Sequence, residues 1–151
     1  MSSKIHMKYY GNLPIMTYEI EHNFVEITPA LYEDYTKCLH KAGYEKWPHK
    51  LTLKRACIYI PQCWFGIIKD RKLVATCAVS FGVLKKMKPL PDSCEIEALA
   101  VIPEYRKRGL GTAIVRRVIK ATMEHGYKNI FVAVHPERKA AVKTYKKVGF
   151  E

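Results

Sequence analysis

The sequence lacks any hydrophobic run long enough to cross a membrane. No apolar stretch approaches the roughly 18 residues that a membrane-spanning helix needs. The N-terminal residues Met-Ser-Ser-Lys-Ile-His-Met-Lys contain no apolar segment of the kind found in secretory signals. Internal repeats and low-complexity tracts are missing as well. These absences predict a cytoplasmic protein with no membrane partner.

Paired cysteines are also missing. The chain has five cysteines, an odd number, and no Cys-x-x-Cys pair. This pattern argues against both a disulfide framework and a zinc site, so we expect buried free thiols and no metal. No cysteine stands at a predicted helix N-terminus, where the thiol pKa would be lowered. A cysteine nucleophile is therefore not expected.

Acidic residues are scarce: 14 Asp and Glu stand against 26 Lys and Arg, which gives the 151-residue chain a net charge of +12. Such a surplus attracts anions and admits a phosphorylated small ligand, an acidic surface or nucleic acid. The aromatic residues are dispersed, and no predicted strand carries the stacking pattern of RNA-binding modules. Nucleic acid is therefore the less favoured partner.

Hydrophobic patterning predicts a single domain over residues 1–151, of mixed α/β class. Thr28 and Pro29 form a helix start, and Gly43 is placed to end that helix. The expected strands are 4–10, 15–21, 24–27, the hairpin 64–84, 94–101 and 129–134; the expected helices are 29–42, 49–58, 109–125 and 138–148; and 85–93 is expected to be a basic, proline-broken loop.

The strongest local motif is Arg-Lys-Arg-Gly-Leu-Gly at 106–111, directly after a predicted strand and at the start of a predicted helix. Its glycines allow a close approach of the backbone, and the first helical turn leaves N–H groups unpaired. We expect these amides, over residues 107–112, to bind a pyrophosphate with help from Arg106, Lys107 and Arg108. The motif is neither a Walker sequence nor a dinucleotide fingerprint.

Residues 94–150 resemble the GNAT superfamily of N-acetyltransferases. The run 106–111 is similar to the family's R/Q-x-x-G-x-G/A signature, and 141–150 is similar to its A-x-x-x-Y-x-K-x-G-F ending; the order of elements over 24–84 fits more loosely. The resemblance implies a central mixed, twisted sheet flanked by about four helices, acetyl-coenzyme A as cosubstrate and a primary amine as acceptor. One departure is Arg138, where family members often carry Asn.

Glu95 and Glu97 are two apart on one predicted strand, so their side chains share a face of the sheet. We expect at least one to be a general base acting through water, and the alternative is ion pairing with surplus Lys and Arg. The resemblance makes Tyr145 the general acid beside the coenzyme sulfur, whereas its pattern alone fits a core residue. His135 is left outside the catalytic set.

The resemblance also implies a binding set for the coenzyme. The backbone of Leu99, Ala100 and Val101 is expected to pair with the pantetheine arm as an added strand would. The remaining expected contacts come from the signature and from the start of the last helix: Arg106, Lys107, Arg108, Gly109, Leu110, Gly111, Thr112 and Arg138.

The acceptor is the least specified part of the prediction. Positive charge favours an anionic acceptor, and the Ile-Glu-Ala-Leu-Ala-Val run is similar to glucosamine 6-phosphate N-acetyltransferases, so an anionic amino sugar is expected. The alternatives are a protein lysine or N-terminal amine, or a non-catalytic module that binds RNA or ribosomes.

The two ends of the chain predict an unusual connection. Family domains continue past Gly-Phe with two more strands, whereas this sequence stops at 149–151, and residues 1–22 precede the 24–150 core. An uncovered 129–134 strand would be an apolar edge that favours a homodimer. We expect a circular permutation in which the N-terminal strands cover that edge, with 15–21 beside 129–134. The alternative is a truncated chain with an unrelated extension.

Overall fold

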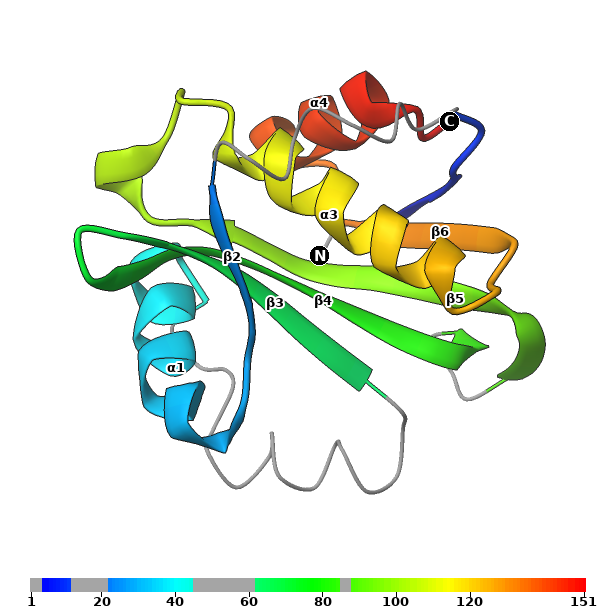
Figure 1. The fold of residues 1–151 in the computed structure, drawn as a ribbon. Coiled ribbons are helices and arrows are strands. Elements are labelled where there is room, and N and C mark those ends of the chain that lie inside the picture. The colour runs from blue at the N-terminus through cyan, green and yellow to red at the C-terminus, as the bar shows by residue number, and fades with distance from the viewer. Residues whose placement is uncertain (1–3, 12–21, 45–61, 85–87) are drawn as a thin grey trace.

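The computed structural model describes residues 4–11, 22–44, 62–84 and 88–151, and these residues contain one six-stranded sheet with three α-helices (Figure 1). The strands are β1 (Ile5–Lys8), β2 (Asn23–Glu26), β3 (Gln62–Lys69), β4 (Lys72–Leu84), β5 (Lys88–Val101) and β6 (Asn129–Val134). The helices are α1 (Tyr32–Lys41), α3 (Leu110–Glu124) and α4 (Lys139–Val148). The mixed α/β class is confirmed, and the helix expected over 49–58 lies outside the described residues.

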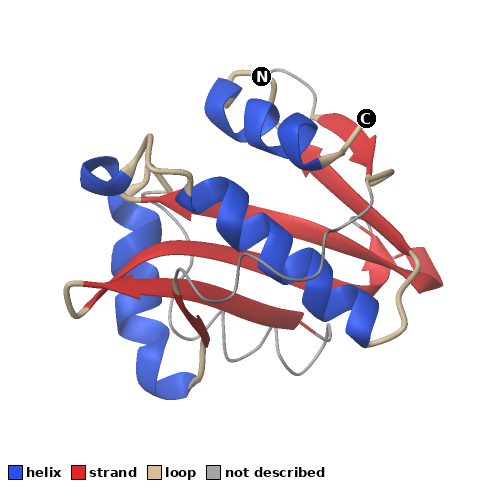
Figure 2. Ribbon diagram, turned by 45° about the horizontal axis from the view of Figure 1, so that its top comes forward, coloured by secondary structure: helices blue, strands red, loops and turns tan. Residues whose placement is uncertain are grey.

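The sheet has the order β1-β6-β5-β4-β3-β2, in which only β5 and β6 run parallel. Helices α1 and α3 lie on opposite faces of the sheet, and α4 lies toward the β6 end (Figures 1 and 2). Because both faces are covered, residues 73–80 of β4 are all buried. This explains why β4 carries an almost unbroken apolar run.

Helix α1 begins later than its sequence pattern indicates. Residues Pro29–Leu31 form a 3₁₀ turn after Thr28, whose side chain makes no capping hydrogen bond, and the α-helix starts at Tyr32. The predicted end is confirmed, because Gly43 has a φ of 109°, a left-handed value that favours glycine.

The loop predicted over 85–93 is wrong for residues 88–93, which form the start of β5. Val83 pairs with Pro89 and Leu84 with Lys88, so the β4–β5 hairpin extends beyond the rest of the sheet. Strand β6 joins β5 only from Ser93 onward. Among the described strands this part of β5 has a partner on one side only, and such edge positions are where sheets accept proline.

Strand β1 covers the edge of β6, as predicted for the N-terminal segment. It pairs antiparallel, with Ile5 opposite Val134 and Lys8 opposite Phe131. Its other edge meets the end of the chain, where the Lys8 N–H donates to the Glu151 carbonyl at 2.8 Å. Residues 15–21 lie outside the described part, but the place predicted for them beside 129–134 is taken by β1 on one side and β5 on the other, so that pairing is wrong. The circular permutation itself stays a prediction.

The described residues contain no helix with both the length and the apolar character needed to cross a membrane. They also contain no group of three His, Cys, Asp or Glu side chains placed to hold a metal ion. Among the described cysteines, those at positions 38, 77 and 94 are buried free thiols, as predicted.

Candidate active site

Strand β5 is paired with β6 along only part of its length. The parallel pairing joins residues 93–96 to 129–132, and within the described chain no strand pairs with 97–101 on that side. Ala98 has a φ of 54°, and the β4–β5 register shifts between Thr76 and Ala78. Such a bulge bends a strand. The bend and the end of the β6 pairing leave an open edge, defined here as residues 97–101 of β5.

Two carbonyls on the open edge are hydrogen-bonded by side chains. The Ile102 N–H donates to the Val74 carbonyl, and because backbone groups alternate along a strand, Val101 and Leu99 face away from β4. The Tyr44 hydroxyl donates to the Leu99 carbonyl at 3.1 Å, and Arg106 Nε donates to the Val101 carbonyl at 2.9 Å. Side chains therefore occupy places that a neighbouring strand fills elsewhere.

The signature loop leads into the N-terminus of α3 with no side-chain cap. Gly109 is the N-cap residue with a φ of 78°, and Lys107 also has a positive φ of 62°. The first N–H groups of a helix have no partner within it, so those of residues 110–112 are available to a ligand, whereas the Ala113 N–H already donates to the Gly109 carbonyl. Gly111 lies next to α4, since a Cβ added there would meet Thr144 Oγ1 at 3.6 Å.

The two arginines of the loop hold other parts of the protein. Arg106 bonds the Val101 carbonyl and, through its terminal nitrogen, the Ala42 carbonyl at 3.3 Å. Arg108 bonds the Glu104 carbonyl at 3.2 Å and lies 4.8 Å from the centre of the Tyr105 ring. Both guanidinium groups thus bind protein atoms, a role the sequence pattern did not indicate.

Glu95 and Glu97 lie on one face of the sheet. Ser80 stands opposite Glu95 in the β4–β5 register, and its hydroxyl donates to Glu97 Oε1 at 3.2 Å. Glu95 is 5% exposed and lies in the part of β5 paired with β6, whereas Glu97 is half-buried and starts the open edge. The two carboxylates therefore differ in environment.

Tyr145 of α4 is buried, with 2% of its surface exposed. Burial raises its pKa well above the usual value, and the nearby Cys77, Tyr44 and Glu97 raise it further. Its hydroxyl therefore stays protonated at neutral pH, the state that a proton donor requires.

Tyr44 is the site residue that sequence reasoning missed. It follows α1 and is half-buried, and the guanidinium of Arg138 lies 3.9 Å from the centre of its ring. Burial raises the pKa of Tyr44, and the Arg138 charge lowers it. A single tyrosine after a helix-ending glycine carries no sequence signal, so only the fold reveals its place.

The buried thiols are unsuited to nucleophilic attack. Burial raises the pKa of Cys38 and of Cys94 to about 12, and it raises that of the fully buried Cys77 as well. These thiols remain protonated at neutral pH, whereas the nucleophile would be the thiolate.

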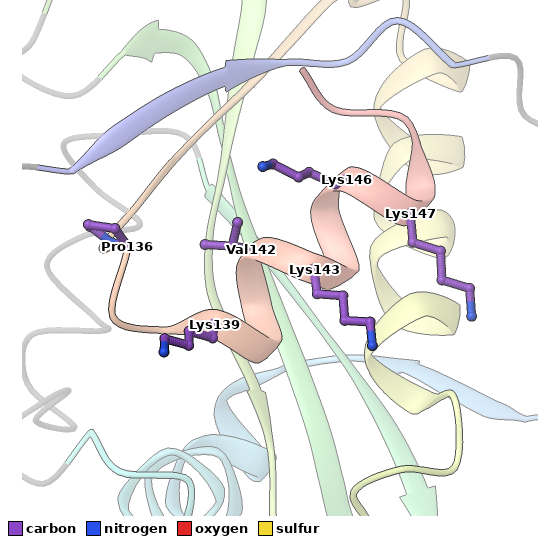
Figure 3. A pocket seen from close by; sticks show the side chains of 6 residues that line it. All are labelled: Pro136, Lys139, Val142, Lys143, Lys146 and Lys147. Atoms are coloured by element: carbon purple, nitrogen blue, oxygen red, sulfur yellow. The ribbon is translucent and has the colours of Figure 1, made fainter.

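The outer face of α4 carries an open hollow of about 590 Å³ (Figure 3). It is lined by Pro136, Lys139, Val142, Lys143, Lys146 and Lys147. Within the described residues, no ion pair joins any of these lysines to a carboxylate. We call this feature the lysine hollow; its charge suits an anionic group. His135 precedes the lysine hollow in the chain, and its Nδ1 lies 3.8 Å from Glu137 Oε1.

Comparison with known proteins shows to which protein family the chain belongs. Residues 27–150 match the acetyltransferase (GNAT) family, and the chain belongs to this family. An uncharacterised N-acetyltransferase of Methanocaldococcus jannaschii is 37% identical over 130 residues, which cover 85% of this chain and 55% of that protein. An N-alpha-acetyltransferase of Arabidopsis thaliana is 30% identical over 104 residues, covering 68% of this chain and 53% of that protein.

A solved structure shows the same fold. The aminoglycoside N-acetyltransferase AAC(6')-Iy, in complex with CoA, superposes with a TM-score of 0.72 at 15% identity, covering 87% of this chain and 88% of that one. The chain spans about half the length of the curated relatives it matches.

Proposed function

We propose that this chain transfers an acetyl group from acetyl-coenzyme A to a primary amine by direct attack of the amine. The observation that carries the proposal is the open edge of β5, which begins at Glu97. At its other end, Val101 lies next to Gly111 at the uncapped N-terminus of α3. Coenzyme A carries an amide-containing arm and a pyrophosphate. An unpaired strand edge can form hydrogen bonds with the amides of the arm, and the free N–H groups at a helix N-terminus can bind the pyrophosphate.

Two groups of backbone atoms would hold the coenzyme. The backbone of Leu99, Ala100 and Val101 forms the open edge, and one N–H group there would polarise the thioester carbonyl. The pyrophosphate would lie on the amides of residues 107–112, where Gly109 and Gly111 leave the backbone uncovered. When bound, the coenzyme supplies an activated acetyl group.

Glu97 is the general base that we favour over Glu95. It begins the open edge, it is half-buried rather than closed off, and its charge acts on Tyr145. A carboxylate in this place can remove a proton from the amine through a water molecule. Tyr145, held protonated by its burial, would return a proton to the departing thiolate of the coenzyme.

An anionic amino sugar such as glucosamine 6-phosphate is the acceptor that we favour. The net charge of +12 and the unpaired lysines of the lysine hollow support an anionic ligand. AAC(6')-Iy, which has the same fold, is named an aminoglycoside N-acetyltransferase, so this fold can accept an amino group on a sugar. Aminoglycosides are cationic, so this neighbour supports the sugar amine and not the negative charge of the favoured acceptor. A polyamine is disfavoured because a strongly cationic protein repels it.

A second acceptor class is a peptide N-terminal amine. It is favoured by the name of the Arabidopsis thaliana relative, an N-alpha-acetyltransferase at 30% identity. The two classes differ in charge, so ionic strength separates them: salt should weaken turnover of a phosphorylated sugar more than that of a neutral peptide.

The test combines binding with turnover. Thermal melting with saturating acetyl-coenzyme A should stabilise the protein by about 3 kcal/mol at a concentration 100 times the Kd. Release of free coenzyme A thiol is then followed with a panel of amino sugars, their 6-phosphates, free amines and peptides. No thermal shift together with no thiol release would overturn the proposal.

A further inference from the structure

Residues 42–44, which follow α1, are held by three elements that are far apart in the sequence. The Ala42 carbonyl accepts a bond from Arg106 before α3, the Tyr44 hydroxyl donates to Leu99 of β5, and Arg138 before α4 stacks on the Tyr44 ring. The short segment therefore bridges the open edge of β5 to the start of α4. This arrangement is not needed to end α1, which Gly43 already does.

The Leu99 carbonyl is the point where this bridge meets the open edge. A chain of amides laid along a strand edge needs the alternate N–H and C=O groups that face it. Leu99 and Val101 present such carbonyls away from β4. The Tyr44 hydroxyl therefore occupies an acceptor that an added strand would use.

The Arg138 guanidinium keeps the Tyr44 ring in this position. A planar guanidinium 3.9 Å from a ring centre stacks on its face, and the contact is stronger when both groups are partly removed from water, as here. Arg138 is also the N-cap residue of α4, so its backbone is fixed. The stack restricts the tyrosine and so favours its hydrogen bond to Leu99.

We propose that Tyr44 and Arg138 are positioning residues that hold the Leu99 carbonyl in the unliganded protein, and that the amide arm of coenzyme A must displace the Tyr44 hydroxyl to bind along residues 99–101. This inference rests on the proposed function, which supplies the amide arm. The inference predicts that the Tyr44 hydroxyl lowers the affinity for the coenzyme. The ordinary expectation for a residue at a binding site is the opposite, namely that its removal weakens binding.

The decisive variant is Tyr44→Phe, which keeps the ring and its stack and removes only the hydroxyl. Titration calorimetry with coenzyme A should show a Kd lower by about three- to tenfold, the worth of one ordinary hydrogen bond. The matched control is Tyr127→Phe, whose ring packs on Phe81 near the start of β6 and should leave the Kd unchanged. An unchanged or higher Kd for Tyr44→Phe would overturn the inference.

The role of Arg138 is tested by Arg138→Lys, which keeps the charge and loses the planar stack. Its Kd should also fall, by less than that of Tyr44→Phe, and adding Arg138→Lys to Tyr44→Phe should give no further change. If Arg138→Lys changed the Kd equally in the wild type and in Tyr44→Phe, Arg138 would not act through Tyr44. The proposal that Arg138 positions Tyr44 would then be wrong.

Two further readouts separate the possible failures. Tyr44→Phe should have a slightly lower Tm without ligand while its affinity rises, whereas a general loosening of the fold would lower both. If the wild-type protein binds no coenzyme A, the proposed function fails. If the wild type binds and Tyr44→Phe binds equally well, only this inference fails.

Discussion

Two consecutive parts of strand β5, residues 93–96 and 97–101, have different surroundings. Residues 93–96 lie between β4 and β6, with their backbone groups in a sheet on both sides. Residues 97–101 have β4 on one side, and on the other they have the side chains of Tyr44 and Arg106. The comparison teaches that the open edge of this sheet arises where the pairing with β6 stops.

The bulge at Ala98 marks the boundary between the two parts. Alanine there adopts a φ of 54°, which is unfavourable for any residue with a Cβ. Strain of this kind persists where the surrounding structure enforces it, often near a functional site. Glu95 lies on the paired side of the boundary and Glu97 on the open side, next to the bulge.

The largest expected difference between the two parts of β5 is in the catalytic effect of their carboxylates. Glu97→Gln should lower kcat by about 10²- to 10⁴-fold, the usual contribution of a general base, because the amide cannot accept the proton. Glu95→Gln, in the paired part, should cost much less. Steady-state rates for both variants decide the assignment, and a larger loss for Glu95→Gln would reverse it.

The next effect is expected at Tyr145. Tyr145→Phe should lower kcat by about 10- to 100-fold with little change in the Kd for coenzyme A, because only the proton donated in the transition state is lost. Since burial raises the pKa of this tyrosine, wild-type kcat should show no loss from its ionisation up to about pH 10. Full activity of the variant would make Tyr145 a core residue only.

A smaller effect is expected at Gly111. Gly111→Ala should fit the free protein, because the added Cβ would lie 3.6 Å from Thr144, an ordinary contact. It should weaken coenzyme binding by about tenfold, equivalent to roughly 1.4 kcal/mol, by obstructing the helix N-terminus. Gly109→Val is less clean, because the φ of 78° at Gly109 strains any side chain.

The control is Lys120→Ala on the far part of α3, where Lys120 pairs with Glu124 at 3.7 Å. Calorimetric titration should give this variant the wild-type Kd. If Gly111→Ala also bound coenzyme A like the wild type, the amides of residues 107–112 would not be the pyrophosphate site.

The smallest effect concerns the bulge itself. Ala98→Gly should stabilise the protein by about 1 kcal/mol, because glycine adopts a positive φ without the Cβ penalty. Urea unfolding measures this change. A destabilised variant would mean that the Ala98 methyl group packs more favourably than its backbone is strained.

Several elements follow from the sequence because their causes are local. Glycines at 43, 109 and 126 adopt the positive φ values that their helix boundaries require. The apolar stripe of α3 and the short apolar run of β6 also predicted those elements to within about two residues. The signature at 106–111 predicted a helix N-terminus with unpaired N–H groups, because the glycines that shape this turn lie within the motif itself.

Other features depended on the tertiary structure, because their partners are distant. Tyr44 reaches a carbonyl 55 residues away, and β1 covers a strand at the opposite end of the chain. Nothing in the composition of residues 88–101 shows where β6 begins or stops pairing. The expected loop over 88–93 was therefore wrong, and only the family resemblance indicated residues 99–101 as an edge open to a ligand. The sequence determined the elements and the family motif; only packing decided which strand edges stay free, because pairing depends on the neighbour as well as on the strand.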